Sequence, residues 1–276
     1  MGIFDRVTRF TQSPGRRPKG GTSLRDAYVP PEPSPAPGQP PPSPADAFAA
    51  AKVAPPRPLV WVGTAASGSQ VWSSPLAGGV GLRMWSDLRA VATEVATWPV
   101  LTGESPIPAS WHLDTAHRLQ DVAQLPDAEA LLAAALERAP EPPQGLRTRL
   151  EPSAEATVEA DLAAGYLALV TDTQNWQVPI SVGFDGVGGW AAVEHASILR
   201  HWSARYKAEV VALTQSSVGL RIGRPPASHE AAYATAQEIY AYCPDVVEHG
   251  LGSMWALATT VAVSPAWSLR WSPSSA

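Results

Sequence analysis

Apolar and polar residues recur with two different periods along the chain from about residue 58 onwards. Strand-like alternation or short apolar runs mark residues 58–64, 98–103, 165–171, 176–183, 208–213, 220–223 and 266–271. A helical period marks residues 81–96, 110–125, 127–139, a short stretch from Ser153, the stretch that carries Ile198, Leu199, Trp202 and Tyr206, and residues 228–243 and 253–263. Because these helices and strands are interleaved, the sequence predicts an α+β (mixed α/β) fold, in which a compact mixed sheet is flanked by helices.

Three local signals add detail to this prediction. Pro99 lies inside a predicted strand and cannot donate a ladder hydrogen bond, so that strand is expected at an edge of the sheet. The turn "TQSSVG" at 214–219 predicts a hairpin, and Ser228 is expected to be the N-cap of a helix that reaches about Cys243. Neither half of this region, before or after about Glu151, holds a self-sufficient sheet, so we expect one domain.

A proline-rich segment precedes the predicted domain. Twelve prolines lie between Pro30 and Pro58, with Ser, Ala, Gly and Gln between them. Such a segment buries too little apolar surface to offset its ordering entropy, so residues 1–57 are expected to be a disordered, basic, Pro-rich arm before a globular domain at 58–272. Its P-x-x-P spacings also suit an SH3-type partner, although composition favours a plain linker.

The first residues of this arm, 2–10, have the spacing of a short amphipathic helix. Ile3, Phe4, Val7 and Phe10 share one side, so the helix is expected to contact a membrane or a partner weakly through them. The alternative is a frayed terminus, because so short a helix is marginal in water.

Charge is distributed unevenly along the chain. Residues 1–57 hold eight Lys and Arg against four Asp and Glu, whereas the remainder holds twelve against twenty-one. An acidic body argues against nucleic-acid binding, because phosphate contacts need clustered cations. The single cysteine fits a reducing cytoplasm and fits a secreted fold without disulfides nearly as well. The absence of an apolar run of about 18 residues and a start without a signal-peptide pattern make the cytoplasm the expected location.

Patterns for metal, phosphate and serine chemistry are incomplete. His112 and His117 are five residues apart, and His195 and His201 are six apart, so neither pair shares a helix face. The glycines of "GFDGVGGW" at 183–190 lack the G-K-[ST] of a phosphate loop, and a tight turn explains them as well. No G-x-S-x-G occurs. The sequence therefore predicts no metal ligands, no cofactor and no catalytic residue.

The stretch "YAYCPDVVEHG" at 240–250 raises the question of a reactive thiol. Cys243 falls at the C-terminal end of a predicted helix, where the dipole and the carboxylates of Asp245 and Glu248 raise a thiol pKa. His249 alone acts in the opposite direction. We expect a structural, buried Cys243 and an Asp245 that caps the following helix, with a nucleophile or a ligand as the alternative.

Tryptophan is abundant, with eleven residues in the chain. Trp85 and Trp202 lie on predicted core faces. Trp190, Trp267 and Trp271 are candidates to line a binding groove, although burial in the core is the favoured fate of any single tryptophan.

Several motifs in one order resemble a known family. The motifs are "MWSDLRAVATEVATWPVLTG", "GGW", "LRHWSARYKAEVVAL", "RPPASHEAA", "YAYCPDVVEHG" and "AWSLRW". They resemble the bacterial family of the domain of unknown function 4253, with a family-like core at about 165–272. The resemblance implies a compact α/β domain and no particular activity. The chain departs from the family pattern at "AAVEHA", Lys207, His249 and the tail "WSPSSA", whereas Cys243, Pro244 and Asp245 match it.

Together these observations favour a non-catalytic protein-binding module, of an adaptor or immunity-like kind, with a protein as its partner. The expected binding residues are Trp190, Arg224, Tyr242, Cys243, Asp245, Trp267 and Trp271. The first alternative is an enzyme with a site near Cys243, Asp245 and Arg224. The second alternative is a protein tethered to a membrane surface through residues 2–10.

Overall fold

Seven strands form one mixed sheet in the computed structural model, which describes residues 40–77, 80–117, 119, 121–143 and 165–272. The strands are β1 (Val60–Thr64), β2 (Gln70–Leu76), β3 (Thr97–Gly103), β4 (Gly165–Thr171), β5 (Ala208–Leu213), β6 (Ser217–Ile222) and β7 (Ala266–Arg270). Their order is β1-β2-β4-β3-β5-β6-β7, and every neighbouring pair is antiparallel except β3 with β5. The predicted α+β class with a mixed sheet is confirmed.

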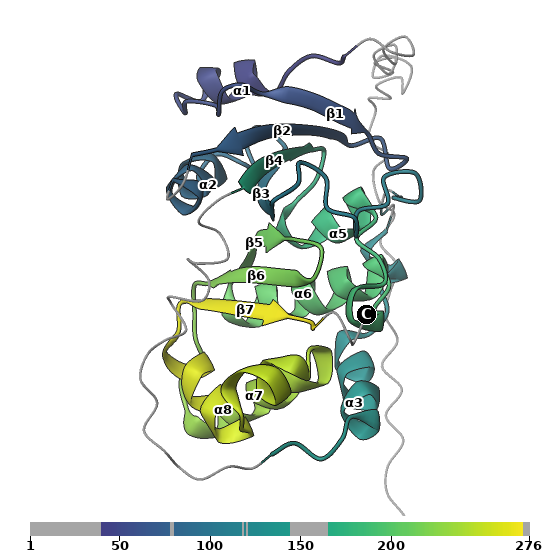
Figure 1. Ribbon diagram of the computed structural model, residues 1–276, viewed down its shortest axis with the longest axis vertical. Coiled ribbons are helices and arrows are strands. Elements are labelled where there is room, and N and C mark those ends of the chain that lie inside the picture. Colours follow the sequence, from purple (N-terminus) through teal and green to yellow (C-terminus); the bar gives the residue numbers. More distant parts are fainter. Residues whose placement is uncertain (1–39, 78–79, 118, 120, 144–164, 273–276) are drawn as a thin grey trace, which may run out of the picture. The chain divides into compact units, whose positions relative to one another are not determined.

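Helices pack along this sheet, as Figure 1 shows. They are α1 (Ala45–Ala50), α2 (Gly81–Arg89), α3 (Ala128–Arg138), α5 (Val178–Val182), α6 (Ala192–Tyr206), α7 (His229–Tyr242) and α8 (Met254–Val263). Short helical turns are η1 (Val122–Gln124), η2 (Asn175–Gln177), η3 (Val187–Gly189) and the π-helix η4 (Val246–Leu251). Helix α6 contacts β5, α3 and α5, while α7 packs against α3 and α8.

Segments from both halves of the chain share the sheet. Strand β3 lies between β4 and β5, so residues before and after Glu151 form one structure. The body also begins ahead of Pro58, because α1 places Phe48 in the core with no exposed surface. The helix expected at 2–10 and the helix expected from Ser153 lie outside the described residues.

The core is centred on β4, the strand between β2 and β3. Four consecutive residues, Leu167 to Val170, are fully buried, so both faces of this strand are covered. Trp85 of α2 and Trp202 of α6 are also buried, as their helical spacing indicated.

Pro99 does not mark a sheet edge, and this prediction was wrong. Strand β3 is an interior strand, and Pro99 faces Leu169 of β4 in the ladder. On the other side, β3 and β5 pair at a single position, Leu101 with Ala212. The missing N–H of Pro99 is tolerated because the ladder with β5 does not extend to it.

Side chains replace the ladder hydrogen bonds that β5 lacks there. The indole N–H of Trp98 donates to the Val210 carbonyl oxygen over 2.9 Å. Asn175 of η2 accepts from the Val210 N–H at 2.5 Å and donates to the Ala208 carbonyl oxygen at 2.8 Å. Two side chains therefore satisfy the main chain of β5 where a neighbouring strand would otherwise bind.

Four segments differ from the sequence prediction. Residues 110–125 do not form a long helix; Trp111 instead bridges to Phe184, and η1 is the only helical turn among the described residues of this range. Residues 176–183, expected as a strand, form η2 and α5, with Pro179 in the first turn and Gly183 as a left-handed C-cap. The helix expected at 81–96 ends at Arg89, and β2 was not predicted.

The last hundred residues follow their prediction closely. Strands β5 and β6 form the expected hairpin. Ser228 caps α7 by accepting a hydrogen bond from the Ala231 N–H at 3.1 Å. Helix α8 and strand β7 occupy the predicted segments, so the region around Cys243 is built as the pattern indicated.

Candidate functional site

The four aromatic residues expected to bind a partner lie together in the protein interior. Trp190 and Trp271 contact Tyr242 directly, and Trp267 is linked to Tyr242 through Trp202. The ring of Tyr242 lies 5.6 Å from that of Trp190 and 5.2 Å from that of Trp271. Trp202 bridges Tyr242 and Trp267, at 5.2 and 5.8 Å. All are buried. These side chains therefore shape the site from inside rather than forming an exposed patch.

A buried histidine lies in the same cluster and was not selected from the sequence. His195 of α6 is fully buried, and its Nδ1 lies 2.5 Å from the Tyr242 hydroxyl. Burial lowers the pKa of His195 to about 3, an effect that the Val187 backbone partly opposes. Burial also raises the pKa of Tyr242 well above its ordinary value. The pair is thus neutral at physiological pH and serves packing.

Cys243 is buried at the end of α7, as expected. Its thiol donates a hydrogen bond to the Arg270 carbonyl oxygen over 3.3 Å. Burial raises the pKa of the Cys243 thiol well above its usual range, and the charge of Asp245 acts in the same direction. A thiol that stays protonated is a poor nucleophile and a poor metal ligand.

Asp245 stands at the expected N-cap position of η4, but its side chain makes no capping hydrogen bond there. Its carboxylate accepts a hydrogen bond from the Ser272 N–H at 2.5 Å and pairs with His249 Nδ1 at 3.2 Å. The Asp245 side chain is nearly buried, whereas the His249 side chain is more than half exposed. Asp245 therefore fixes the chain after β7 and orients His249.

Arg224 binds the main chain at the C-terminal end of α6. Its guanidinium donates to the carbonyl oxygens of Arg205, at 2.9 Å, and Ala204, at 3.2 Å. These are the carbonyls that a helix end leaves without intrahelical partners. Arg224 therefore acts as a C-terminal cap, and it does not line the cavity that contains Asp245.

A cavity of about 380 Å³ runs along the whole of β7 and is called the β7 groove here. Every residue of β7 lines it, and its other wall comes from η4 and α8. The apolar part of that wall is made by Leu251, Leu257 and Val261, while Asp245 and His249 add polar groups. Figure 1 shows β7 as the last strand of the sheet, next to α7 and α8.

The hydrogen-bond register of β7 decides which peptide groups face this groove. The Trp271 N–H donates to the Ser216 carbonyl oxygen, and the Ile222 N–H donates to the Pro265 carbonyl oxygen. In an antiparallel ladder such contacts recur at every second residue, so positions 265, 267, 269 and 271 bind β6. The peptide groups of positions 266, 268 and 270 point away from β6.

Side chains occupy two of these three outward positions. The Ser264 hydroxyl donates to the Ala266 carbonyl oxygen at 2.5 Å and accepts from its N–H at 3.2 Å. The Cys243 thiol donates a hydrogen bond to the Arg270 carbonyl oxygen. At Ser268, within the described chain, no partner binds the outward N–H and carbonyl oxygen. The centre of the edge is therefore open, and it opens into the groove.

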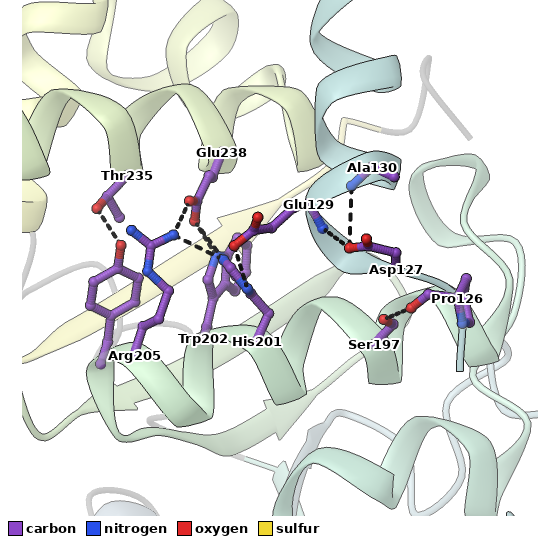
Figure 2. A network of polar contacts seen from close by, with 11 residues as sticks. Pro126, Asp127, Glu129, Ala130, Ser197, His201, Trp202, Arg205, Thr235 and Glu238 are labelled. Carbon is purple, nitrogen blue, oxygen red and sulfur yellow. Dashed lines mark hydrogen bonds and ion pairs between the residues drawn. The ribbon is translucent and has the colours of Figure 1, made fainter. Parts of the chain in front are cut away.

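A polar network joins α7 to α6 through Glu238. Glu238 accepts from the Trp202 indole N–H at 2.9 Å and from Arg205 at 2.5 Å, and it lies 3.5 Å from His201 Nε2 (Figure 2). Burial alone would raise the pKa of Glu238, but these hydrogen bonds and charges lower it. Glu238 is thus an ionised side chain that ties α7 to α6.

Metal and membrane features are absent from the part of the chain that the structure describes. In that part, no group of three or more His, Cys, Asp or Glu side chains is placed to hold a metal ion. None of the described helices combines the length and the apolar character that crossing a bilayer requires.

The β7 groove lies within a recognisable family segment. Residues 166–272 match the family model described as Domain of unknown function (DUF4253), which confirms the resemblance for this C-terminal part of the chain. A search of curated proteins found no match. A search of solved structures also found no match. The family description carries no activity, so the function must be argued from the groove itself.

The sequence located part of this site. Cys243 and Asp245 stand out in one dense motif and Trp267 in the excess of tryptophan; Cys243 contacts β7, Asp245 lines the groove and Trp267 belongs to β7 itself. Ser268 and Thr260, which line the groove centre, were not selected. The alternation of "AWSLRW" predicted which side chains are buried, but the position of β7 at the sheet edge is a property of the tertiary fold.

Proposed function

We propose that this protein is a non-catalytic protein-binding module that binds an extended segment of a partner in the β7 groove. The observation that carries the proposal is the open peptide group of Ser268 at the centre of an edge strand that borders a cavity. An unpaired strand edge is a template for another strand, and proteins ordinarily cover or charge such edges.

Strand addition supplies both affinity and selectivity. The N–H and the carbonyl oxygen of Ser268 provide one pair of main-chain hydrogen bonds to an added strand. Val246 and Leu251 of η4 offer an apolar surface to one side chain of that strand, because both line the groove and are only partly buried. An extended segment with an apolar residue at its centre therefore suits the site.

The charge of the body favours a basic partner. From residue 58 onwards twelve Lys and Arg face twenty-one Asp and Glu. Opposite charge on a partner accelerates its approach and excludes acidic competitors. A partner segment with an apolar centre and flanking Lys or Arg is the occupant that we propose.

Two pairs of variants separate the groove from its surroundings. Thr260→Phe fills the groove, and Thr259→Phe is its control on the same helix, because both hydroxyls donate to the carbonyl four residues earlier and only Thr260 lines the cavity. Ser268→Pro removes the outward N–H without removing a β6–β7 hydrogen bond, and Ser268→Ala keeps that N–H.

The experiment selects ligands from a library of displayed peptides with the full-length protein as bait. We expect enriched peptides that bind the native chain, Thr259→Phe and Ser268→Ala alike, and that lose about tenfold or more in affinity with Thr260→Phe and Ser268→Pro. Peptides that bind all four variants equally would place the binding surface elsewhere and refute the β7 groove.

An enzyme remains the second candidate because of one contact. Asp245 holds His249 Nδ1 at 3.2 Å beside the groove, which is how a carboxylate orients a general base. The buried thiol of Cys243 does not supply a nucleophile to this pair. Mass measurement of selected peptides after long incubation separates the two functions. Peptides that stay intact support the binding module. Peptides that are cleaved or modified by the native protein, but stay intact with His249→Gln, support the enzyme.

A further inference from the structure

A second cavity, of about 320 Å³, lies where β4 ends and β3 begins. Ala96 and Trp98 line it on the β3 side, and Asp172 and Thr173 line it on the β4 side. The two strands are paired here, since Thr97 faces Thr171. Its volume is at the lower end of the range for small-molecule sites, about 300–1,000 Å³.

Buried hydroxyl groups form the floor of this cavity. Ser69, Thr173 and Ser181 line it, and each is more than nine-tenths buried. The hydroxyls of Thr173 and Ser181 are 2.8 Å apart, and Ser67 donates to the Ser181 carbonyl oxygen at 2.8 Å. The Ser69 hydroxyl, in contrast, has no hydrogen-bond partner among the described residues. Because this hydroxyl lines the cavity, it is free to bind a ligand there.

Strained backbone holds the rim of the cavity in place. Ala96 and Asp172 both have left-handed backbone angles, with φ of 49° and 53°, and the Asp172 N–H donates to the Ala96 carbonyl oxygen at 2.7 Å. Such angles are unfavourable for non-glycine residues and gather at ligand sites and other functional positions. The hydrogen bond between Asp172 and Ala96 therefore holds the backbone of Asp172 in place at the rim of the cavity.

The lining selects for neutral ligands with many hydroxyl groups. Hydroxyls and the amides of Gln174 and Gln177 both donate and accept hydrogen bonds, as ligand hydroxyls do. Among the residues that the structure describes, no Lys, Arg or His lines the cavity, so these residues offer an anion no counter-charge. Of the described lining residues only Asp172 carries a charge, and it is exposed, so water screens its attraction for a cation.

We propose that this cavity binds a small, neutral, polyhydroxylated molecule of monosaccharide size, with the Ser69 hydroxyl as a direct contact. The site is separate from the β7 groove, because the two cavities share no lining residue. Some residues that line this cavity, such as Asp172 and Ser181, lie within the matched family segment, and others, such as Ser69 and Trp98, lie before it.

The chain supplies a matched control for this contact. Ser73 of β2 is also buried, and its hydroxyl has no partner among the described residues, but it does not line the cavity. Ser69→Ala and Ser73→Ala therefore remove the same group, one inside and one outside the proposed site. Gln177→Leu is a third variant, on a side chain that is only partly buried, and it tests the site independently of Ser69.

The experiment titrates the full-length protein by ligand-observed NMR with a panel of hexoses, pentoses, inositol and glycerol, and with putrescine and inorganic phosphate as charged comparators. We expect one of the neutral polyols to bind saturably, with a dissociation constant of about 1 mM or tighter. We also expect about a tenfold loss of affinity for Ser69→Ala and for Gln177→Leu, and none for Ser73→Ala.

Three results would overturn this assignment. The first is a panel in which no neutral polyol reaches saturation. The second is binding of putrescine or phosphate alone, which would assign the cavity to a charged ligand. The third is a polyol whose affinity is the same in Ser69→Ala, Gln177→Leu and the native chain, which would place its site elsewhere.

Discussion

The thiol of Cys243 donates a hydrogen bond to the main-chain carbonyl oxygen of Arg270, 3.3 Å away. This contact joins the end of α7 to the outer edge of β7, and it occupies one of the outward carbonyls of that strand. Cys243, which the sequence offered as a possible nucleophile or ligand, is therefore a structural residue. Because Cys243 and Ser264 bind the outward groups of Arg270 and Ala266, the open part of the β7 edge is the peptide group of Ser268.

Cys243 should be unreactive in the folded protein. Burial and the raised pKa of its thiol keep the thiolate population small, so alkylation by iodoacetamide at pH 8 should be about 100-fold slower in buffer than in denaturant. Intact-mass spectrometry over time measures both rates. Equal rates in the two solvents would mean that the thiol is accessible, and the enzyme alternative would regain its nucleophile.

His195 should make the protein less stable in acid. Its pKa is about 3 when folded and about 6.5 when unfolded, so between these values the unfolded chain binds a proton that the native chain does not. Stability should therefore fall as pH decreases from about 6.5 to 3, by on the order of 4 kcal/mol. Urea denaturation followed by tryptophan fluorescence at several pH values measures this loss.

His195→Asn isolates that contribution, because asparagine does not titrate and can still bind the Tyr242 hydroxyl. We expect this variant to be less stable at pH 7 but to lose much less stability on acidification. His117→Asn, at an exposed position, is the control and should keep the native pH dependence. An unchanged acid limb in His195→Asn would assign the effect to other groups.

Gly188 should tolerate no side chain. A Cβ at this position would lie 2.2 Å from Nε1 of the buried Trp271, and its φ is 63°. Gly189 also has a left-handed φ, of 78°, but a Cβ there would meet nothing within 4 Å. Both Gly→Ala variants carry the backbone cost of about 1 kcal/mol, and Gly188→Ala should lose about 2 kcal/mol more through overpacking. Equal stabilities in chemical denaturation would contradict the close approach of Trp271.

Glu238 should stabilise the contact between α6 and α7 through its charge. Glu238→Gln leaves Arg205 without its carboxylate partner and should cost about 1–3 kcal/mol at pH 7. Because the folded pKa of Glu238 is lowered, this stabilisation is complete above the unfolded value of 4.5 and is lost as pH falls through the folded value. Glu137→Gln, on the exposed face of α3, should have almost no effect in the same denaturation experiment.

The regular elements of the last hundred residues were predictable from their apolar period, whereas residues 110–125 and 176–183, which depend on tertiary contacts, were not. Helix α7 carries its own start signal in Ser228, and β5 and β6 are joined by a short turn. Pro99 gave a misleading signal, because the rule that confines proline to edges assumes a complete ladder on both sides. Here Trp98 and Asn175 satisfy the neighbouring strand instead.

The candidate site shows the same division. Asp245 and Cys243 stood out because polar and reactive residues are dense in one short motif. Ser268 gave no signal, because a serine in an alternating strand reads as an ordinary half-exposed residue. Its importance comes from the place of β7 at the end of the sheet order, which no local pattern encodes.

Amide hydrogen exchange at single-residue resolution measures whether the edge of β7 is open at Ser268. In the free protein the Ser268 amide should exchange at least about tenfold faster than those of Trp267 and Leu269, which donate to β6. A peptide selected for the β7 groove should then slow exchange at Ser268 and leave its two neighbours unchanged. Equal protection of all three amides in the free protein would show that the edge is already covered, and the binding site proposed here would be lost.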